Sequence, residues 1–180
     1  METLADLFED TLRDIYYAEK QILKALPKMA KKAGSEDLAA AFGKHEGETE
    51  DQVARLEKVF KIIGKSPRGK KCDAIEGIIA EAEGLMKEAG TDTVRDAAML
   101  AAAQAVEHYE ISRYGTLKAW ATKLGMDDAA ELLDETLEEE KATDEALTEL
   151  AETEINAEAD DQPEEHEGAM KPKKRAAGRR

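Results

Sequence analysis

Apolar residues recur at steps of three and four along four long segments of the chain, a spacing that gives each segment one apolar face when it is helical. Over residues 3–33 the apolar positions are Leu12, Ile15, Ile22, Leu26, Met29 and Ala33. Over residues 36–63 they are Leu38, Phe42, Leu56, Val59 and Ile63. Two further long helices are predicted over roughly 92–124 and 127–156.

Short turn signals separate the helices within two pairs. Gly34-Ser35 lies between the first two helices and Gly125-Met126 between the last two. Ser35 also fits the N-cap of the second helix, because two acidic residues follow it at the positive end of the helix. Short turns join antiparallel neighbours, so each pair is expected to form a helical hairpin.

The connection between the two hairpins is long. It starts with turn signals from Gly64 to Gly69 and includes the stretch KSPRGKKCDAIEGIIAEAEGLMKEAGTD, in which one short helix of about 15 residues fits. Such a connection can cross the length of the bundle, so that the second and third long helices run parallel. The predicted fold is therefore all-α, a ferritin-like four-helix bundle with a long crossover that contains a short fifth helix.

An internal repeat supports two equivalent hairpins. When the chain is shifted by 91 residues, AKKAGSEDLAAAF falls on ATKLGMDDAAELL. The same shift places Glu19 on Glu110 and Glu48 on Glu139. Four carboxylates are therefore predicted at equivalent places in the two halves.

These four glutamates lie where their helices are expected to face inward. Glu19 stands between Ile15 and Ile22, and Glu48 interrupts the apolar face between Phe42 and Leu56. A single glutamate in such a helix is usually solvated. Four near one level of a core would cost on the order of several kcal/mol each unless a shared counter-charge compensates them. Two divalent cations can supply that charge, as in the carboxylate proteins of ferritin-like bundles.

Histidine is placed differently from the usual two-metal bundle. The Glu-x-x-His step common in such proteins is absent after both Glu48 and Glu139. Instead, His45 precedes Glu48 by three residues and Glu107 precedes Glu110 by three. His45 is therefore either a ligand or a hydrogen-bonded core histidine. Oxygen ligands with an imidazole suit Fe(II) or Mn(II) better than a metal that prefers sulfur.

Several neighbours leave alternatives open. Glu140 is the rival of Glu139, because it lies on an equally good stripe with Leu133, Leu137, Asp144 and Leu147. His108 is one step off the face of Glu107 and Glu110, which favours a structural or supporting role. Cys72 reads as a small buried hydrophobe rather than a reactive thiol. Packing and redox roles are both open for Tyr16, Tyr17, Tyr109 and Tyr114.

Composition agrees with one helical domain. The chain has 180 residues, 42% of them apolar and only 4% aromatic, and its net charge is −15. A single cysteine excludes an internal disulfide and fits a reducing compartment. The first residues lack a basic and then apolar leader, and no apolar run approaches the roughly 20 residues of a membrane span. A cytoplasmic protein without membrane contact is expected.

The bundle is expected over residues 1–156, and the charge pattern predicts a disordered tail over 157–180. Residues 154–167 hold seven acidic residues and no Lys or Arg, whereas residues 171–180 hold six basic residues and no acid. Charge blocks of this kind are typical of solvated appendages. The basic end could bind nucleic acid weakly, but the acidic body opposes it.

Several strings together closely resemble the YciE/YciF family of bacterial proteins: YAEKQILKALPKMA, the His45–Thr49 segment, KCDAIEGIIAE, AAAQAVEHYEISRYGTL and ETLEEEKATDEALTELA. The resemblance covers about residues 1–155. It implies a ferritin-like bundle, often dimeric, that is associated with stress responses and is ferroxidase-like or iron-binding. The matching metal-site positions are Glu19, His45, Glu48, Glu107, Glu110 and Glu139. The segment GETED departs from the family at Gly47 and Glu50, which argues against a metal role for Glu50.

The sequence therefore predicts a two-metal carboxylate centre, with two irons per chain as the leading hypothesis, acting with O2 or peroxide in a homodimer. A manganese centre that disproportionates peroxide on the same scaffold is one rival. The other is a metal-free stress-response scaffold that binds partners through its charged surfaces. A storage cage is disfavoured, since no feature of the sequence indicates a large assembly.

Overall fold

The computed structural model describes residues 1–160, and within this range all regular structure is helical. The five main helices are α1 Leu4–Lys32, α2 Glu36–Ile62, α3 Asp73–Glu88, α4 Asp92–Lys123 and α5 Asp127–Leu150. A π-helical segment, Ala151–Ile155, and the short α6, Asn156–Asp160, continue α5. The predicted helix boundaries are therefore correct to within a residue or two for α1, α2 and α4.

Local side-chain and backbone features set the helix ends. Thr3 forms a capping box at the start of α1, and the Ser35 hydroxyl accepts a hydrogen bond from the Leu38 amide at 3.2 Å, as predicted for an N-cap. Thr91 caps α4 in the same way. Gly64 and Gly125 follow α2 and α4 with φ of +69° and +73°, a left-handed conformation that glycine adopts without a steric penalty.

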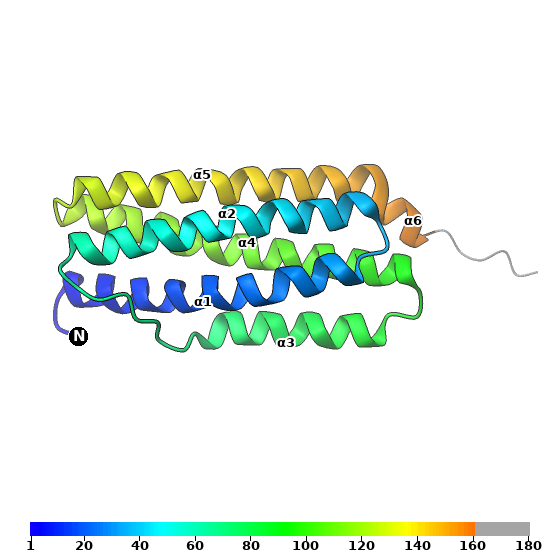
Figure 1. Ribbon diagram of the computed structural model, residues 1–180, viewed down its shortest axis with the longest axis horizontal. Helices are drawn as coiled ribbons and strands as arrows, with labels where there is room; N and C mark the ends of the chain where they lie inside the picture. The colour runs from blue at the N-terminus through cyan, green and yellow to red at the C-terminus, as the bar shows by residue number, and fades with distance from the viewer. Residues whose placement is uncertain (161–180) are drawn as a thin grey trace, which may run out of the picture.

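Figure 1 shows the two predicted hairpins, α1 with α2 and α4 with α5, side by side in one bundle. Helix α2 ends near the start of α1, and the crossover returns the chain to the opposite end, where α4 begins. As a result α2 and α4 run parallel, and α1 and α5 pack mainly with antiparallel neighbours. The prediction of a ferritin-like four-helix bundle with a helical crossover is confirmed.

The repeat is visible in the core stripes of α2 and α5. Six of the buried positions on α2 form one stripe, which is Leu38, Phe42, His45, Thr49, Gln52 and Leu56. A shift of 91 residues gives six buried positions of α5, which are Ala129, Leu133, Thr136, Glu140, Thr143 and Leu147. Both stripes alternate steps of four and three, the spacing of helices that cross at a shallow angle. Each stripe is apolar at its ends and polar in the middle.

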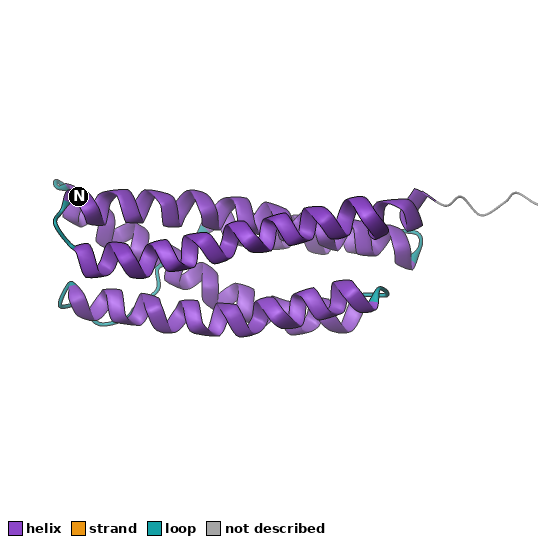
Figure 2. Cartoon of the chain, turned by 90° about the horizontal axis from the view of Figure 1, so that it is seen from above, coloured by secondary structure: helices purple, strands orange, loops and turns teal. Residues whose placement is uncertain are grey.

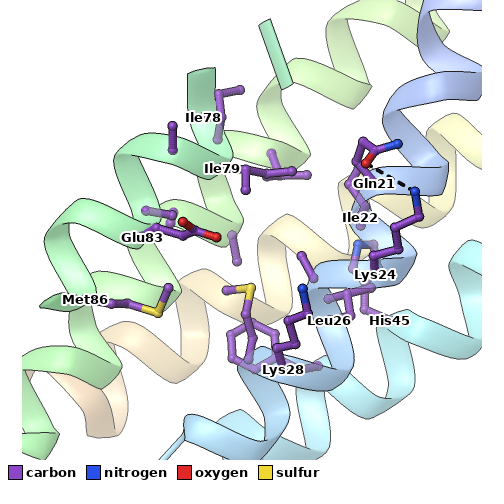
Figure 3. A pocket seen from close by; sticks show the side chains of 18 of the residues that line it. Gln21, Ile22, Lys24, Leu26, Lys28, His45, Ile78, Ile79, Glu83 and Met86 are labelled. Atoms are coloured by element: carbon purple, nitrogen blue, oxygen red, sulfur yellow. Dashed lines mark hydrogen bonds between the residues drawn. The ribbon is translucent and has the colours of Figure 1, made fainter. Parts of the chain in front are cut away.

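The crossover helix α3 covers one flank of the bundle, where it packs on α4 and α1. In Figure 1 it runs along the lower edge of the bundle beside α1, and Figure 2 shows only helices and loops in the described part of the chain. Ile75 is fully buried against the core, and Cys72 caps the helix with its sulfur 3.5 Å from the Ile75 amide. An apolar hollow lies between α3 and its two neighbours (Figure 3). Cys72 is buried, as predicted.

No helix in the described part of the chain is long and apolar enough to cross a membrane. The predicted tail begins at residue 157, but residues 157–160 belong to α6. The remainder of that prediction, residues 161–180, lies outside the described residues.

Asp96 fixes the turn between α1 and α2 to the start of α4. Its carboxylate is 3% exposed and accepts hydrogen bonds from the Gly34 amide at 2.9 Å and the Ser35 amide at 2.7 Å. Asp96→Ala should lower the free energy of unfolding by about 2–3 kcal/mol, because the two amides of the turn lose a buried, charged partner. Urea unfolding measures this. Asp92→Ala, which removes an exposed carboxylate of the same helix, should cost less than about 0.5 kcal/mol; equal costs would contradict the assigned role.

Candidate metal centre

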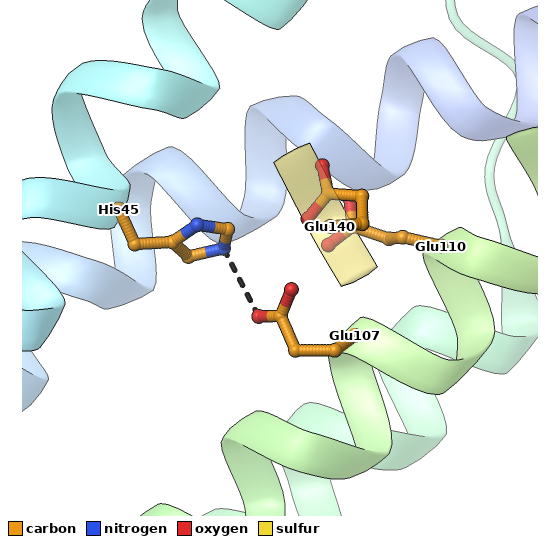
Figure 4. Close-up of side chains that lie close together, drawn as sticks. All are labelled: His45, Glu107, Glu110 and Glu140. Atoms are coloured by element: carbon orange, nitrogen blue, oxygen red, sulfur yellow. Dashed lines mark ion pairs between the residues drawn. The ribbon is translucent and has the colours of Figure 1, made fainter. Parts of the chain in front are cut away.

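Four glutamates and one histidine meet in the middle layer of the bundle. Glu19 comes from α1, Glu107 and Glu110 come from α4, and Glu140 comes from α5. Their exposed fractions are 0–1%, and His45 of α2 is 5% exposed. One ligand atom from each of His45, Glu107, Glu110 and Glu140 lies within 4.8 Å of the others (Figure 4). We call these five residues the carboxylate cluster.

Glu19 completes the cluster from the α1 side. The Tyr114 hydroxyl, which is fully buried, donates a hydrogen bond to one Glu19 oxygen. Burial, followed by the charge of Glu19, raises the pKa of Glu110 well above its usual range, as expected for neighbouring carboxylates. Each of the four long helices therefore contributes to the cluster.

Most of the ligand atoms in the cluster have no hydrogen-bond partner. These atoms are Glu19 Oε2, both nitrogens of His45, Glu107 Oε2, and both oxygens of Glu110 and of Glu140. His45 Nε2 lies 3.2 Å from Glu107 Oε1, but the contact lacks hydrogen-bond geometry. Among the described residues, no lysine or arginine pairs with any of the four glutamates. So many buried polar atoms without partners are exceptional in a folded protein.

Burial changes the protonation of these groups. Desolvation, followed by the charge of Glu140, raises the pKa of Glu19 to about 8. Desolvation likewise raises the pKa of Glu107 to about 8 and that of Glu110 and Glu140 well above the usual range. The same effect lowers the pKa of His45 to about 4, so its imidazole is neutral at pH 7. The cluster can therefore release protons and offer a neutral imidazole to a cation.

The donor set fits hard divalent cations. Carboxylate oxygens with one imidazole suit Fe(II) and Mn(II), and they exclude a site built for a metal that prefers sulfur. Four ionised glutamates carry a charge of −4, which two divalent cations balance at +4. The partnerless atoms are the ones that such ions would bind. The cluster could therefore hold a metal ion.

The structure brings together four of the six residues that the sequence singled out: Glu19, His45, Glu107 and Glu110. Glu48 lies at the edge of the cluster. Its Oε1 pairs with Lys44 at 2.7 Å, while its Oε2 is buried without a partner beside a small cavity lined by His45 and Glu107. Glu48 is thus half-buried rather than fully inward.

The prediction that Glu139 faces inward is corrected: the inner position of α5 belongs to Glu140. The side chain of Glu139 is 28% exposed, and both of its oxygens pair with Arg55 of α2 at 2.6 Å. Gln52 donates a further hydrogen bond to it at 3.2 Å. Successive residues of a helix point about 100° apart, so only one of the two glutamates can face the centre. Glu140 was the rival that the apolar stripe of α5 had indicated.

The other polar candidates lie outside the cluster, and of these Tyr114 donates a hydrogen bond to it through Glu19. The side chain of His108 is 70% exposed and pairs with Asp144 at 3.1 Å, consistent with the structural role that was favoured. Tyr16 donates to Glu57, and Tyr17 donates to Glu76. Tyr109 lies 3.1 Å from the sulfur of Cys72 and donates to an aspartate of α1 at 3.0 Å.

Sequence reasoning missed two buried threonines in the same layer, Thr49 and Thr136. The Thr49 hydroxyl donates to the His45 carbonyl of its own helix at 2.8 Å, which satisfies it locally. Both threonines lie on the alternating stripes described above. These stripes could have predicted that the two threonines are buried, because the alternating four- and three-residue spacing continues from the apolar residues through the polar ones.

Fold and cluster together define the class: a ferritin-like helical bundle with a buried carboxylate cluster that could bind metal. The chain matches the family described as Domain of unknown function (DUF892) over residues 3–160. It is also 47% identical to Protein YciF of Escherichia coli strain K12, over 89% of this chain and 97% of that protein. The chain therefore belongs to the DUF892 family, which confirms the resemblance to YciE/YciF proteins.

Solved structures agree with this assignment. The crystal structure of the E. coli stress protein YciF matches with a TM-score of 0.82, covering 87% of this chain and 99% of that one. YcfI of Rhodopseudomonas palustris, provisionally described as a structural protein, is 52% identical with a TM-score of 0.80, over 82% of this chain and 94% of that one. A protein from Xanthomonas campestris shares the fold at 24% identity and a TM-score of 0.68, over 86% and 94% of the chains.

The raised pKa values make the stability of the metal-free protein depend on pH. At pH 7 the folded cluster holds protons that unfolded glutamates, with pKa values near 4.5, do not bind. Stability is therefore lost as pH rises through the folded pKa values. Between pH 6.5 and 8.5 we expect Tm to fall by roughly 5–10 °C, given about 2–4 °C per kcal/mol for a chain of this size. His45 stays neutral across this range.

Calorimetry of chelator-treated protein measures this fall. Glu110→Gln should flatten the curve, because it removes one of the titrating groups but keeps its shape. Glu139→Gln should change the slope much less than Glu110→Gln does, since Glu139 is paired with Arg55 outside the cluster and its charge is only a minor influence on the pKa of Glu19. A Tm that rises over this pH range would show that the folded cluster does not hold these protons at pH 7.

Proposed function

We propose that the carboxylate cluster binds two Fe(II) ions as substrate and promotes their oxidation to Fe(III) by O2 or peroxide. The observation that supports this is the set of four fully buried glutamates without a lysine or arginine partner among the described residues. Burial of uncompensated carboxylates is costly, and a cation is the counter-charge that their oxygens select. Carboxylates also favour the harder Fe(III) over Fe(II), which drives the oxidation.

Each residue has a role in this proposal. Glu19, Glu107, Glu110 and Glu140 hold the ions, and His45 offers a neutral nitrogen. The protons retained by the metal-free cluster leave as the ions enter. Two Fe(II) lose two electrons. With two protons, these electrons convert one O2 to hydrogen peroxide, or one hydrogen peroxide to two water molecules. The Tyr114 hydroxyl holds one oxygen of Glu19, so that the other is directed at the cluster.

The biological role that we propose follows from the relatives. E. coli YciF is described as a stress protein, and its match to this chain covers 99% of the YciF structure. Removal of free Fe(II) together with an oxidant would suit such a protein, because the two react to give damaging products when both are free. A manganese centre is the second candidate, since the same oxygen and imidazole donors suit Mn(II).

Metal content tests the assignment of the ligands. After anaerobic loading with Fe(II) and desalting, mass spectrometry should find about two irons per chain in the wild type. Glu110→Gln together with Glu140→Gln should retain at least about tenfold less, because each change removes ionised ligand oxygens. Glu139→Gln is the matched control and should keep the wild-type content.

Three outcomes would overturn parts of this assignment. No retained iron in the wild type would favour a metal-free scaffold, whereas selective retention of manganese from an equal mixture would favour the second candidate. Loss of iron in Glu139→Gln but not in the double variant would restore Glu139 as the ligand.

Oxidation itself is a separate test. Aerobic addition of about two Fe(II) per chain should give Fe(III) absorbance faster than in buffer alone, and oxygen or peroxide should be consumed in proportion. The Glu110→Gln and Glu140→Gln double variant should oxidise Fe(II) no faster than buffer does. Equal rates for wild type, variant and buffer would contradict an oxidising function while leaving metal binding in place.

A further inference from the structure

The hollow beside α3 leads to the carboxylate cluster. It has a volume of about 390 Å³, within the range of roughly 300–1,000 Å³ that is typical of small-molecule sites. Its walls are mainly apolar and are contributed by α1, α3 and α4, including Ile22, Leu26, Met29, Ile79, Met86 and Val106. His45 and Glu107 of the cluster, which are both buried, also line it. The hollow therefore joins the protein surface to the edge of the cluster.

The α1 side of its mouth is basic. Lys24, Lys28 and Lys32 all line the hollow and are exposed. They belong to the stretch KQILKALPKMAKK, which has five lysines and no acidic residue in a chain with a net charge of −15. Among the described residues, neither Lys28 nor Lys32 has a carboxylate partner within ion-pair distance. Three cations one helical turn apart can attract one anionic group.

The α3 side carries two acids, but each has its own partner. Glu76 accepts a hydrogen bond from the Tyr17 hydroxyl at 2.6 Å, and Glu83 lies 3.9 Å from Lys87. Figure 3 shows Lys24 and Lys28 on one side of the hollow, with Ile79, Glu83 and Met86 on the other and His45 deeper. The hollow is thus polar and positive at one rim and apolar along its length.

We propose that this hollow binds an amphipathic anion, namely a medium-chain aliphatic carboxylate. Its carboxylate lies among Lys24, Lys28 and Lys32, and its chain runs along the apolar walls towards His45 and Glu107. The apolar walls account for a chain, and the lysines account for the charge at one end of it. An inorganic anion would leave the walls without contacts.

Binding at this site does not require metal, since none of the lining lysines or apolar residues belongs to the cluster. Action of the centre on the inner end of the bound chain would rest on the function proposed above. The two proposals can therefore fail separately: metal-free protein that binds the carboxylate but retains no iron would keep this one and remove the other.

Titration calorimetry of the metal-free full chain with decanoate tests the proposal. We expect one site per chain, with affinity that falls at high salt because exposed charges are screened. Lys24→Ala with Lys28→Ala should weaken binding by about fivefold, the scale of exposed ion pairs. Ile79→Trp should abolish binding by filling the hollow from its half-buried wall. Lys31→Ala, an exposed lysine outside the lining, should bind decanoate as the wild type does.

Butyrate, with the same charge and a short chain, should bind far more weakly than decanoate. Equal binding of the two, or decanoate binding that survives both Ile79→Trp and the double lysine variant, would overturn the proposal. An absence of decanoate binding by the wild-type chain would also overturn it, and a change of oligomeric state in the double lysine variant would then indicate that a second copy of the chain covers the hollow. Circular dichroism confirms that each variant is folded.

Discussion

The arrangement of this protein depends on the burial of four carboxylates in one layer of a helical core. Each of Glu19, Glu107, Glu110 and Glu140 is almost completely removed from water, and no lysine or arginine of the described residues compensates them. Ionised groups in such a place are unfavourable unless they are neutralised by protons or by cations. The apolar layers on either side must therefore be stable enough to hold the helices together around an unfavourable middle. Local caps and the Asp96 contact with the first turn add to that stability.

Much of the fold could be predicted because its causes are local. The three- and four-residue spacing set the helices, glycine and capping residues set their ends, and the length of the central connection set the parallel course of α2 and α4. The structure buries Glu19, His45, Glu107 and Glu110, four of the six residues predicted for the metal site, and their binding of metal stays a prediction. Those residues lie on helix faces that the three- and four-residue spacing of the sequence already indicates.

The choice between Glu139 and Glu140 could not be made in the same way. The repeat correctly paired Glu48 with Glu139, and the structure makes the two equivalent: both are half-buried, and each pairs with a base. Equivalence does not show that a position faces inward, however. The inner pair one residue later consists of Thr49 and Glu140, whose different side chains hid their correspondence. The contact of Glu139 with Arg55 joins two helices and has no local sequence signal.

The two hairpins are unequal partners in the cluster. The first, α1 with α2, contributes Glu19 and His45, whereas the second, α4 with α5, contributes three glutamates. Neither hairpin alone holds the full set, and only the crossover links them covalently. If the cluster holds cations as proposed, these ions act as ionic cross-links between the two halves of the chain. A chain cut in the crossover would then behave as two complementing fragments, whose reassembly is controlled by metal supply rather than by chain connectivity.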